Sequence, residues 1–158
     1  MRNIYAKFCV ILLLLSNTSH AIEDSLLKSI EISASGNRFQ AERLKIAAEN
    51  LANDNSTSDK PGGKPYQRKV VYATNIYNKK LKTRLVKVKK FGVDNTPFKV
   101  KYDPNHSAAD KEGYVKLPNV DKIIEKADSI EAQRSYEANL SMIETSRSML
   151  EKTIDAMR

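Results

Sequence analysis

The residues best suited to acid–base chemistry gather around His106. Asp103, Asp110 and Glu112 lie near this histidine in a segment punctuated by Pro and Gly, and a carboxylate beside an imidazole can transfer protons. However, no second histidine or activated nucleophile completes the set, and a lone loop histidine more often forms hydrogen bonds within its own loop. The sequence therefore predicts no catalytic site and no enzyme.

Chemistry that depends on a cofactor or a metal has as little support. The sequence PGGKP at 61–65 lacks the Gly-Lys-Ser/Thr ending of a phosphate-binding loop and does not lead into a helical pattern. The single cysteine, Cys9, and one of the two histidines, His20, lie among the first 21 residues. Because the rest of the chain has one histidine and no cysteine, it lacks the ligands of the common metal sites, and we expect no metal and no cofactor.

The first 21 residues have the pattern of a secretory signal. Positive charge precedes an apolar run from Phe8 to Leu15, and the small residues of Ser19-His20-Ala21 suit cleavage. An apolar run this short does not make a stable membrane span, which takes about 20 residues. We therefore expect an exported chain, cut between Ala21 and Ile22, that has no disulfide. A buried N-terminal helix or a misassigned start is the alternative interpretation.

Positive charge is concentrated in the middle of the chain. The formal net charge is +8, but residues 60–101 hold 13 Lys or Arg and a single acid, Asp94. Such a run can bind nucleic acid, but no aromatic stacking motif interrupts it, and an exported protein rarely meets nucleic acid. We expect no nucleic-acid partner. An anionic cell-envelope polymer or an acidic neighbouring subunit fits the charge better.

Residues in the first part of the exported chain repeat at alternating intervals of three and four, which is the spacing of a coiled-coil seam. A helix over residues 23–52 would be about 45 Å long, and it would end at the turn-forming residues 53–56. Asn37 is the one clearly polar member, and such a residue commonly fixes register or partner number. The predicted interface residues of this segment are Leu27, Ile30, Ala34, Asn37, Ala41, Leu44, Ala48 and Leu51.

The last part of the chain also predicts a long helix, about 55 Å in length over residues 121–157. Asn119 or Asp121 can cap its start. A first apolar repeat changes phase at residues 131–135, where Arg134 takes a position that the first repeat would bury, so we expect the helix to change partners there. The first repeat consists of Val120, Ile123, Ala127 and Ile130. The predicted interface residues beyond the phase change are Tyr136, Leu140, Ile143, Leu150, Ile154 and Met157.

Between the helices the sequence predicts short strands. The segments 66–73, 85–91, 98–102 and 114–117 are rich in Val, Tyr and Phe and are bounded by Pro, Gly and Asn. A set of lysines on two of these strands alternates with apolar residues, which predicts a row of ammonium groups on one exposed sheet face. Such a row either keeps exposed strands soluble or binds the anionic partner. The lysines are Lys87, Lys89, Lys99 and Lys101.

Two helices this long and narrow cannot bury their apolar faces within one small globule. The patterns therefore favour self-assembly into a tubular polymer, with the helices inside and the β-rich part outside; a monomeric two-helix hairpin with a β-insertion is the alternative. The predicted fold class is mainly α, with long terminal helices that pair as a coiled coil and a small, short-stranded basic insertion between them. The expected divisions are a signal at 1–21, an N-terminal helix at 22–54, a β-rich domain at 55–118 and a C-terminal helix at 119–158.

Several stretches of the chain resemble known flagellar proteins. The sequence RLKIAAENLAND at 43–54 resembles the N-terminal signature of flagellar axial proteins, in which a helix ends in Asn-Leu-Ala-Asn. Three further stretches resemble the proximal-rod proteins of the bacterial flagellar basal body, the FlgC family. They are GGKPYQRKVV at 62–71, YDPNHSAADKEGYVKLPNVD at 102–121 and EAQRSYEANLSMIETSRSMLEKTI at 131–154. The resemblance extends from about Ser29 to the C-terminus.

The resemblance implies a structural role. Members of this family are non-enzymatic subunits of the rod, which transmits motor torque through the periplasm, and their partners are copies of themselves and other rod proteins. Their terminal helices pair around the export channel, and the β-rich part lies outside. Family members usually travel without a cleaved signal, so residues 1–21 depart from the pattern. A secreted basic module that binds the envelope and dimerises through its helices is the alternative function.

Overall fold

The described part of the chain consists of two long helices and four strands. The computed structural model describes the backbone of residues 2–156 and the side chains of residues 24–156. Helices with small antiparallel strand pairs between them confirm the predicted combination of a mainly helical chain and a β-rich middle. In chain order the elements are α1 (Arg2–Ala52), β1 (Lys69–Asn78), β2 (Thr83–Val93), β3 (Lys99–Tyr102), β4 (Tyr114–Leu117) and α2 (Lys122–Ala156).

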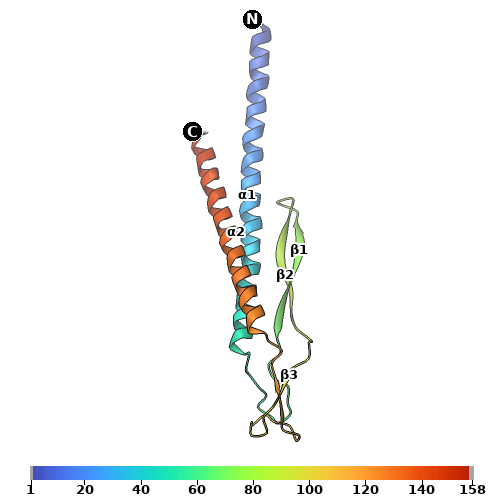
Figure 1. Cartoon of the computed structure of the whole chain (residues 1–158). Coiled ribbons are helices and arrows are strands. Elements are labelled where there is room, and N and C mark those ends of the chain that lie inside the picture. The colour runs from blue at the N-terminus through green and yellow to red at the C-terminus, as the bar shows by residue number, and fades with distance from the viewer. Residues whose placement is uncertain (1, 157–158) are drawn as a thin grey trace.

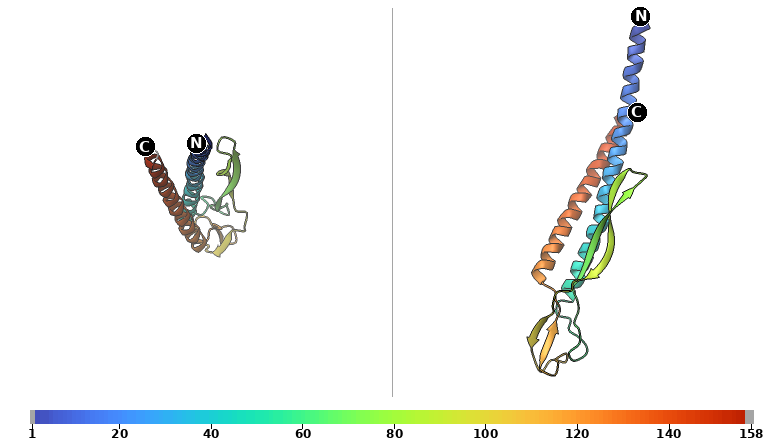
Figure 2. Two further views of the ribbon diagram at one scale, coloured as in Figure 1. Left: turned by 90° about the horizontal axis from the view of Figure 1, so that it is seen from above. Right: turned by 90° about the vertical axis from the view of Figure 1, so that its right-hand side faces the viewer.

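The two helices lie side by side and run in opposite directions (Figure 1). The hairpin of β1 and β2 lies along the other side of α1, so that α1 is between α2 and the hairpin both in the side view and from above (Figures 1 and 2). The β3 and β4 strands and their loops lie at the end of the molecule away from the chain termini. The molecule is therefore elongated, with long helices at one end and a small β-rich part at the other.

The end of α1 agrees with the sequence pattern. The backbone N–H of Asn53 donates to the carbonyl oxygens of Glu49 and Asn50, both at 3.2 Å, and its side-chain amide donates to Glu49 O at 2.9 Å. These bonds satisfy carbonyl groups of the last turn and end the helix at Ala52. At the other end the backbone is helical from Arg2, well before residue 23, where the predicted helix begins. The run before residue 23 is rich in Leu, a strong helix former.

The α2 helix occupies the predicted span. The carboxylate of Asp121 accepts the backbone N–H of Ile123 at 2.8 Å, so Asp121 is the cap. The other predicted cap, Asn119, instead accepts the backbone N–H of Arg68 at 2.8 Å. The helix continues without a break through residues 131–135, where the sequence pattern changes phase.

The strands form two separate antiparallel sheets, one of β1 and β2 and one of β3 and β4. Lys87 and Lys89 lie in the first sheet, and Lys99 and Lys101 lie in the second. The prediction that these lysines share one sheet face is therefore wrong. The chain turns after β2, where the Asp94 carboxylate accepts the N–H of residue 96 at 2.9 Å, and the following proline has no N–H to donate to a ladder.

The buried core is small. Several polar side chains are as deeply buried as the apolar ones, among them Asn50 and Glu125, whereas many large apolar side chains on the helices are exposed. This distribution reverses the usual one. Among the residues that the structure describes, no helix is long and apolar enough to cross a membrane. The buried apolar residues are Ile46, Ala47, Leu85, Ala108, Val115, Val120 and Ala132.

Candidate assembly surfaces

The α1 helix meets α2 through residues spaced seven apart. This spacing keeps the contacts on one side of a helix that packs along its length. The contacts given by hydrogen bonds and by the close approach at Gly36 join small or polar residues, and we call this set the inner seam. Its members on α1 are Ser29, Gly36, Arg43 and Asn50, and their respective partners on α2 are Ser146, Asn139, Glu131 and Glu125.

Small side chains let the two helices approach closely along the inner seam. The hydroxyl groups of Ser29 and Ser146 are 3.3 Å apart. A Cβ atom added at Gly36 would lie 2.7 Å from Nδ2 of Asn139, so this glycine makes room for the asparagine. Polar and small residues thus join the helices at these places, while large apolar side chains such as Leu27 and Leu140 remain exposed.

The predicted interface residues of α1 form two columns beside the inner seam. Each residue of the first column directly follows a seam residue in the sequence. Each residue of the second, which we call the outer column, precedes a seam residue by two positions. Two positions turn a helix by about 160°, so the outer column faces away from α2. The first column is Ile30, Asn37, Leu44 and Leu51, and the outer column is Leu27, Ala34, Ala41 and Ala48.

Burial follows this division. In the first column Asn37 is buried and the other three residues are half-buried; in the outer column Ala34 is half-buried and the others are exposed. Asn37 is 9% exposed, and its Oδ1 accepts no hydrogen bond from the described residues. Leaving such a group without a donor costs about 1–3 kcal/mol. The predicted seam is therefore partly buried and partly open, with an unsatisfied carbonyl at its centre.

The predicted interface residues of α2 are largely open as well. Tyr136, Leu140 and Ile154 are 37%, 42% and 44% exposed, and Ile143 and Leu150 are half-buried. Met157 lies outside the described residues. The role of these residues in contacts between subunits stays a prediction. Cleavage between residues 21 and 22 also stays a prediction, and the side chains at this site lie outside the described residues.

The two apolar repeats of α2 lie on different sides of the helix. Ile123 and Ile130 of the first repeat are 79% and 53% exposed, and both lie away from Glu125 of the inner seam. Beyond the phase change, Ile143 is half-buried. Tyr136 and Leu140 lie on a different side of the helix from Ile123 and Ile130, and the change of partners at the phase change stays a prediction.

A hydrogen-bond junction ties the base of the hairpin to both helices. Asn50 is fully buried, and its Nδ2 donates to Glu125 Oε2 at 3.0 Å and to the carbonyl oxygen of Lys69 at 2.9 Å. Its Oδ1 accepts the backbone N–H of Lys69 and the hydroxyl of Tyr66, both at 2.9 Å. One amide thus joins the end of α1, the start of β1 and the first turn of α2.

Arg68 completes the junction. Its Nε lies 2.5 Å from Glu125 Oε1, and its other nitrogens lie 3.5 Å from Asp94 and 3.3 Å from Asp128. Partial burial acts to lower the pKa of Arg68, but the hydrogen bond and charge of Glu125, with the charges of the two aspartates, raise the pKa overall. The guanidinium therefore stays charged and neutralises Glu125, which is 1% exposed and would be costly to bury without a partner.

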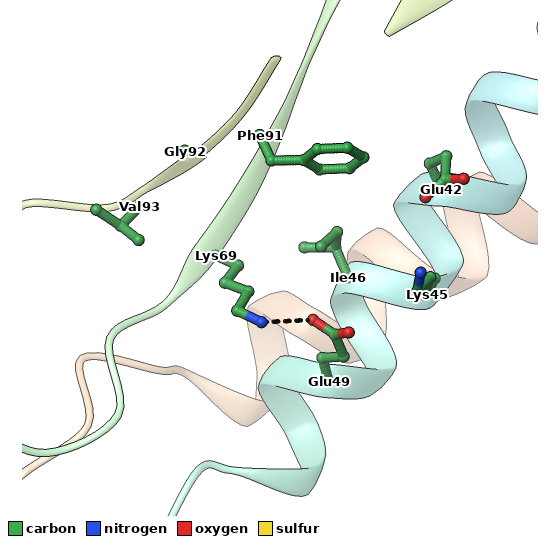
Figure 3. A pocket seen from close by; sticks show the side chains of 8 residues that line it. All are labelled: Glu42, Lys45, Ile46, Glu49, Lys69, Phe91, Gly92 and Val93. Carbon is green, nitrogen blue, oxygen red and sulfur yellow. Dashed lines mark hydrogen bonds and ion pairs between the residues drawn. The ribbon is translucent and has the colours of Figure 1, made fainter.

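The hairpin contacts α1 through both of its strands and leaves a groove beside it. The N–H of Val86 donates to Ser35 Oγ at 3.2 Å. Next to this contact is a hollow of about 580 Å³, and a second hollow of about 380 Å³ follows; Glu42 lines both. Figure 3 shows Phe91 in the second hollow, projecting from the hairpin toward α1 and Ile46. We call the two hollows together the α1–hairpin groove.

A β-bulge alters the lysine pattern of β2. Tyr72 pairs with Lys90, and the next residue, Ala73, pairs with Val88, so Lys89 is the extra residue. The ammonium group of Lys90 lies 5.1 Å from the centroid of the Tyr72 ring, within the range of a cation–π contact. The bulge increases the local twist and interrupts the alternation that the sequence shows.

The predicted lysines are exposed on both sheets. Lys99 donates to a backbone carbonyl oxygen at 2.9 Å, and Lys101 lies 3.5 Å from Asp103. Lys87 lines the α1–hairpin groove, whereas Lys89 is the bulge residue. These lysines therefore do not form one binding surface.

The polar side chains around His106 hold their own loop. The imidazole Nδ1 accepts the N–H of Ala108 at 3.1 Å, and the carboxylate of Asp110 accepts the N–H groups of Glu112 and Tyr114 at 3.1 and 2.8 Å. These are the local hydrogen bonds that short polar side chains commonly form in turns. Among the residues that the structure describes, no group of three or more His, Cys, Asp or Glu is placed to hold a metal ion.

The sequence patterns missed the inner seam and the junction. A signal for the seam existed, because Ser29, Gly36, Arg43 and Asn50 repeat at seven-residue intervals. Polar residues at that spacing normally lie on the solvated side of a helix. The apolar columns beside them were therefore predicted to form the interface. Glu125 had no comparable signal, since its burial depends on Arg68, 57 residues earlier in the chain.

The C-terminal part of the chain matches a known family model. Residues 111–156 match the model described as "Flagellar basal body rod FlgEFG protein C-terminal". The matched range contains β4, the Asp121 cap and α2. It therefore includes the α2 half of the inner seam.

Curated relatives are similar over most of the chain. The flagellar basal-body rod protein FlgC of Agrobacterium fabrum is 45% identical over 135 residues, which cover 85% of this chain and 97% of the relative. The FlgC protein of Escherichia coli O6:H1 is 40% identical over 131 residues, covering 82% and 96% of the two chains. That of Borreliella burgdorferi is 36% identical over 146 residues, covering 82% and 95%. The resemblance inferred from the sequence is confirmed, and the chain belongs to the FlgC family of flagellar basal-body rod proteins.

Proposed function

We propose that this structural rod subunit polymerises through the exposed apolar faces of α1 and α2, and that the polymer transmits motor torque. The observation that carries the proposal is the division of each helix into two surfaces. The inner seam is small and polar, whereas large apolar side chains such as Leu27 and Leu140 are 49% and 42% exposed. Covering apolar surface is worth about 25 cal/mol per Å², so copies of the chain and other rod proteins are the fitting partners. The role is non-enzymatic.

Asn37 supports contact between subunits. Its Oδ1 has no donor among the described residues and is itself buried within the chain, so a donor from a neighbouring subunit would reach it only if the helices shift on assembly. A single polar residue in an otherwise apolar seam sets the register of paired helices. In the assembled rod we propose coiled-coil packing of the axial helices around this position.

The junction suits a part that carries torque. Asn50, Arg68 and Glu125 tie both helices to the start of β1, so that none of the three elements moves without breaking buried bonds. In this proposal the axial helices are residues 22–54 and 119–158, the β-rich domain is 55–118, and residues 1–21 are a leader. Close-packed helices resist sliding, which is the property that a drive shaft needs.

Export through a cleaved signal is part of the proposal, and it puts the assembled protein in the periplasm. The relatives support it indirectly, because the alignments cover 95–97% of each relative but only 82–85% of this chain. N-terminal sequencing of the protein from its native cells tests this point. We expect an N-terminus at Ile22; an uncut protein in assembled rods would contradict it.

A second proposed role is contact with an anionic cell-envelope polymer. Lys79, Lys80 and Lys82 are exposed at the turn of the hairpin, where they suit an anionic surface. Binding of the purified protein to purified cell wall, weakening as salt rises, is the expected result. Binding by a strictly monomeric protein would favour a secreted envelope-binding module over the rod subunit.

Sedimentation velocity and circular dichroism at increasing protein concentration test polymerisation. We expect larger species and more helix as concentration rises, because long amphipathic helices gain order when partners cover them. A monomer whose helix content stays constant at all concentrations would contradict the proposed assembly.

A further inference from the structure

The rim of the α1–hairpin groove carries more cations than acids: Lys69 and Lys87 of the hairpin and two cations of α1 line it, against Glu42 and Glu49 of α1. Arg38 lines the larger hollow and Lys45 the smaller one. Both are exposed. Arg38 forms an ion pair with Glu31 at 3.0 Å, but 64% of the Arg38 side chain stays exposed, and such surface pairs are weak. Seven residues separate the two cations, which places them about 10 Å apart along the helix axis and on the same side of it.

The floor of the groove is apolar. Phe39, Ala41 and Ile76 line the larger hollow, and Ile46 and Phe91 line the smaller one (Figure 3). Phe91 is 55% exposed and Ile76 is 43% exposed. Because Ala41 also belongs to the outer column, the groove and the outer column are continuous. An apolar strip with charges along its rim is the kind of surface that binds the face of an amphipathic helix.

One face of α2 has the complementary pattern. Glu137, Glu144 and Glu151 are exposed and are spaced seven residues apart. Neighbouring acids are therefore about 10 Å apart along the helix axis, the same spacing as the two cations on α1. Tyr136 and Leu140 lie beside these acids and are 37% and 42% exposed. The face therefore presents apolar side chains flanked by a row of negative charge.

This face of α2 cannot reach the groove of its own chain. Glu137 and Glu144 precede the seam residues Asn139 and Ser146 by two positions, so they point about 160° away from α1. The hairpin and the groove lie on the opposite side of α1 from α2 (Figures 1 and 2). The complementary surfaces must therefore belong to different molecules.

We propose that the α1–hairpin groove of one copy binds the outward face of α2 of a second copy. With the two helices antiparallel, as within one chain, Glu144 lies against Arg38 and Glu137 against Lys45. Tyr136 and Leu140 then cover the apolar floor. This inference rests on the proposed polymerisation and names the surfaces that carry it. Because the two surfaces differ, each added copy leaves a free groove and a free helix face, so the contact propagates instead of closing as a symmetric dimer.

Charge reversal on each surface tests the contact, using protein purified with its native N-terminus. The groove variant is Arg38→Glu with Lys45→Glu, and the helix variant is Glu137→Lys with Glu144→Lys. Each variant alone places like charges opposite each other, so we expect at least about a tenfold rise in the concentration needed for half-maximal association in sedimentation velocity. An equimolar mixture restores opposite charges at every contact and should associate like the wild type, in an alternating order.

The matched control is Lys79→Glu with Lys80→Glu, which changes the net charge as much as the groove variant but lies at the hairpin turn. It should associate like the wild type. Association of each charge variant alone at wild-type concentration, or a mixture no better than its parts, overturns the inference while leaving the proposed polymerisation standing. A wild type that stays monomeric overturns both.

Circular dichroism checks that each variant is folded. If the groove variant is unfolded, the double variant Arg38→Gln with Lys45→Gln replaces it. This variant removes the attraction between the two surfaces without adding repulsion. We then expect association to weaken about threefold to tenfold and to lose its sensitivity to salt. Unchanged association with unchanged salt sensitivity would overturn the inference.

Discussion

The side-chain amide of Asn50 lies 3.0 Å from the carboxylate of Glu125, and this hydrogen bond links the last turn of α1 to the first turn of α2. Asn50 is 0% and Glu125 is 1% exposed. Water therefore cannot replace a bond that either side chain loses. The junction is the place where a single substitution should disturb both helices and the hairpin together.

Asn50→Ala should lower the free energy of unfolding by roughly 2–4 kcal/mol. Glu125 and the hydroxyl of Tyr66 each lose a buried partner. Denaturant unfolding followed by circular dichroism measures the change. Asn53→Ala is the matched control, since Asn53 is only half-buried, and it should cost less than about 1 kcal/mol. Equal losses for the two variants would mean that the junction adds nothing beyond an ordinary helix end.

Asp94 should make part of the stability sensitive to acid. The N–H of Thr96 donates to its carboxylate at 2.9 Å. This bond lowers the pKa of Asp94 below its ordinary value of 3.8; desolvation opposes the change, and the Thr96 hydroxyl and Arg68 add to it. A carboxyl group with a depressed folded pKa stabilises the fold above its unfolded pKa and loses that contribution as the pH falls through the folded pKa.

Asp94→Asn should therefore lower the free energy of unfolding near neutral pH and flatten its decline below pH 3.8. Denaturant unfolding at a series of pH values measures both effects. Asp59→Asn, a change at an exposed position, should leave the curve as in the wild type. Parallel wild-type and Asp94→Asn curves would remove Asp94 as a source of acid sensitivity.

Leu140→Asp should abolish assembly and leave the monomer intact. Leu140 is 42% exposed in the single chain, so the change should shift monomer stability by less than about 0.5 kcal/mol. In an assembly the new carboxylate would be buried without a partner. Sedimentation velocity reports association, and thermal unfolding reports stability. Ser141→Asp, at the exposed neighbouring position, should assemble normally; normal assembly of Leu140→Asp would take this face of α2 out of the interface.

Hydrogen exchange should divide α2 into a protected and an unprotected half in the dilute monomer. Residues 125–146 lie along the inner seam, whereas the C-terminal end of α2 lies apart from α1 (Figures 1 and 2). Amides after Ser146 should therefore exchange quickly in the monomer and slowly after assembly. Protection that is uniform along α2 in the monomer would contradict the view that its end waits for a neighbouring subunit.

Local chemistry made much of the fold predictable. Asp121 caps α2 because its short carboxylate accepts the N–H of Ile123 at 2.8 Å, and no distant residue is needed for that bond. Likewise, Asn53 ends α1 through bonds to its own last turn. The strands were placed less well: β1 continues to Asn78, beyond the predicted end at residue 73, because pairing with β2 extends it.

The pairing of the helices was less predictable, and the difference is one helical position. The residues that follow Ser29, Gly36, Arg43 and Asn50 were predicted to form the seam, whereas these four residues themselves contact α2. Both sets have the same seven-residue period, so period alone cannot separate them. Apolar character favoured the set beside the hydrogen-bonded contacts, and the role of that set in the interfaces stays a prediction.

The sequence by itself determined that the chain has two long helices, that α1 ends and α2 begins beside the β-rich part, and that the middle is cationic. It also determined that the protein resembles flagellar rod proteins. These properties depend on capping groups, residue spacing and motifs, which act over a few neighbouring residues. Only the tertiary structure decided that Asn50, Arg68 and Glu125 meet, that the lysines divide between two sheets, and that the α1–hairpin groove lies open. Those results depend on residues far apart in the chain, whose burial is set by the combined packing of both helices and the hairpin.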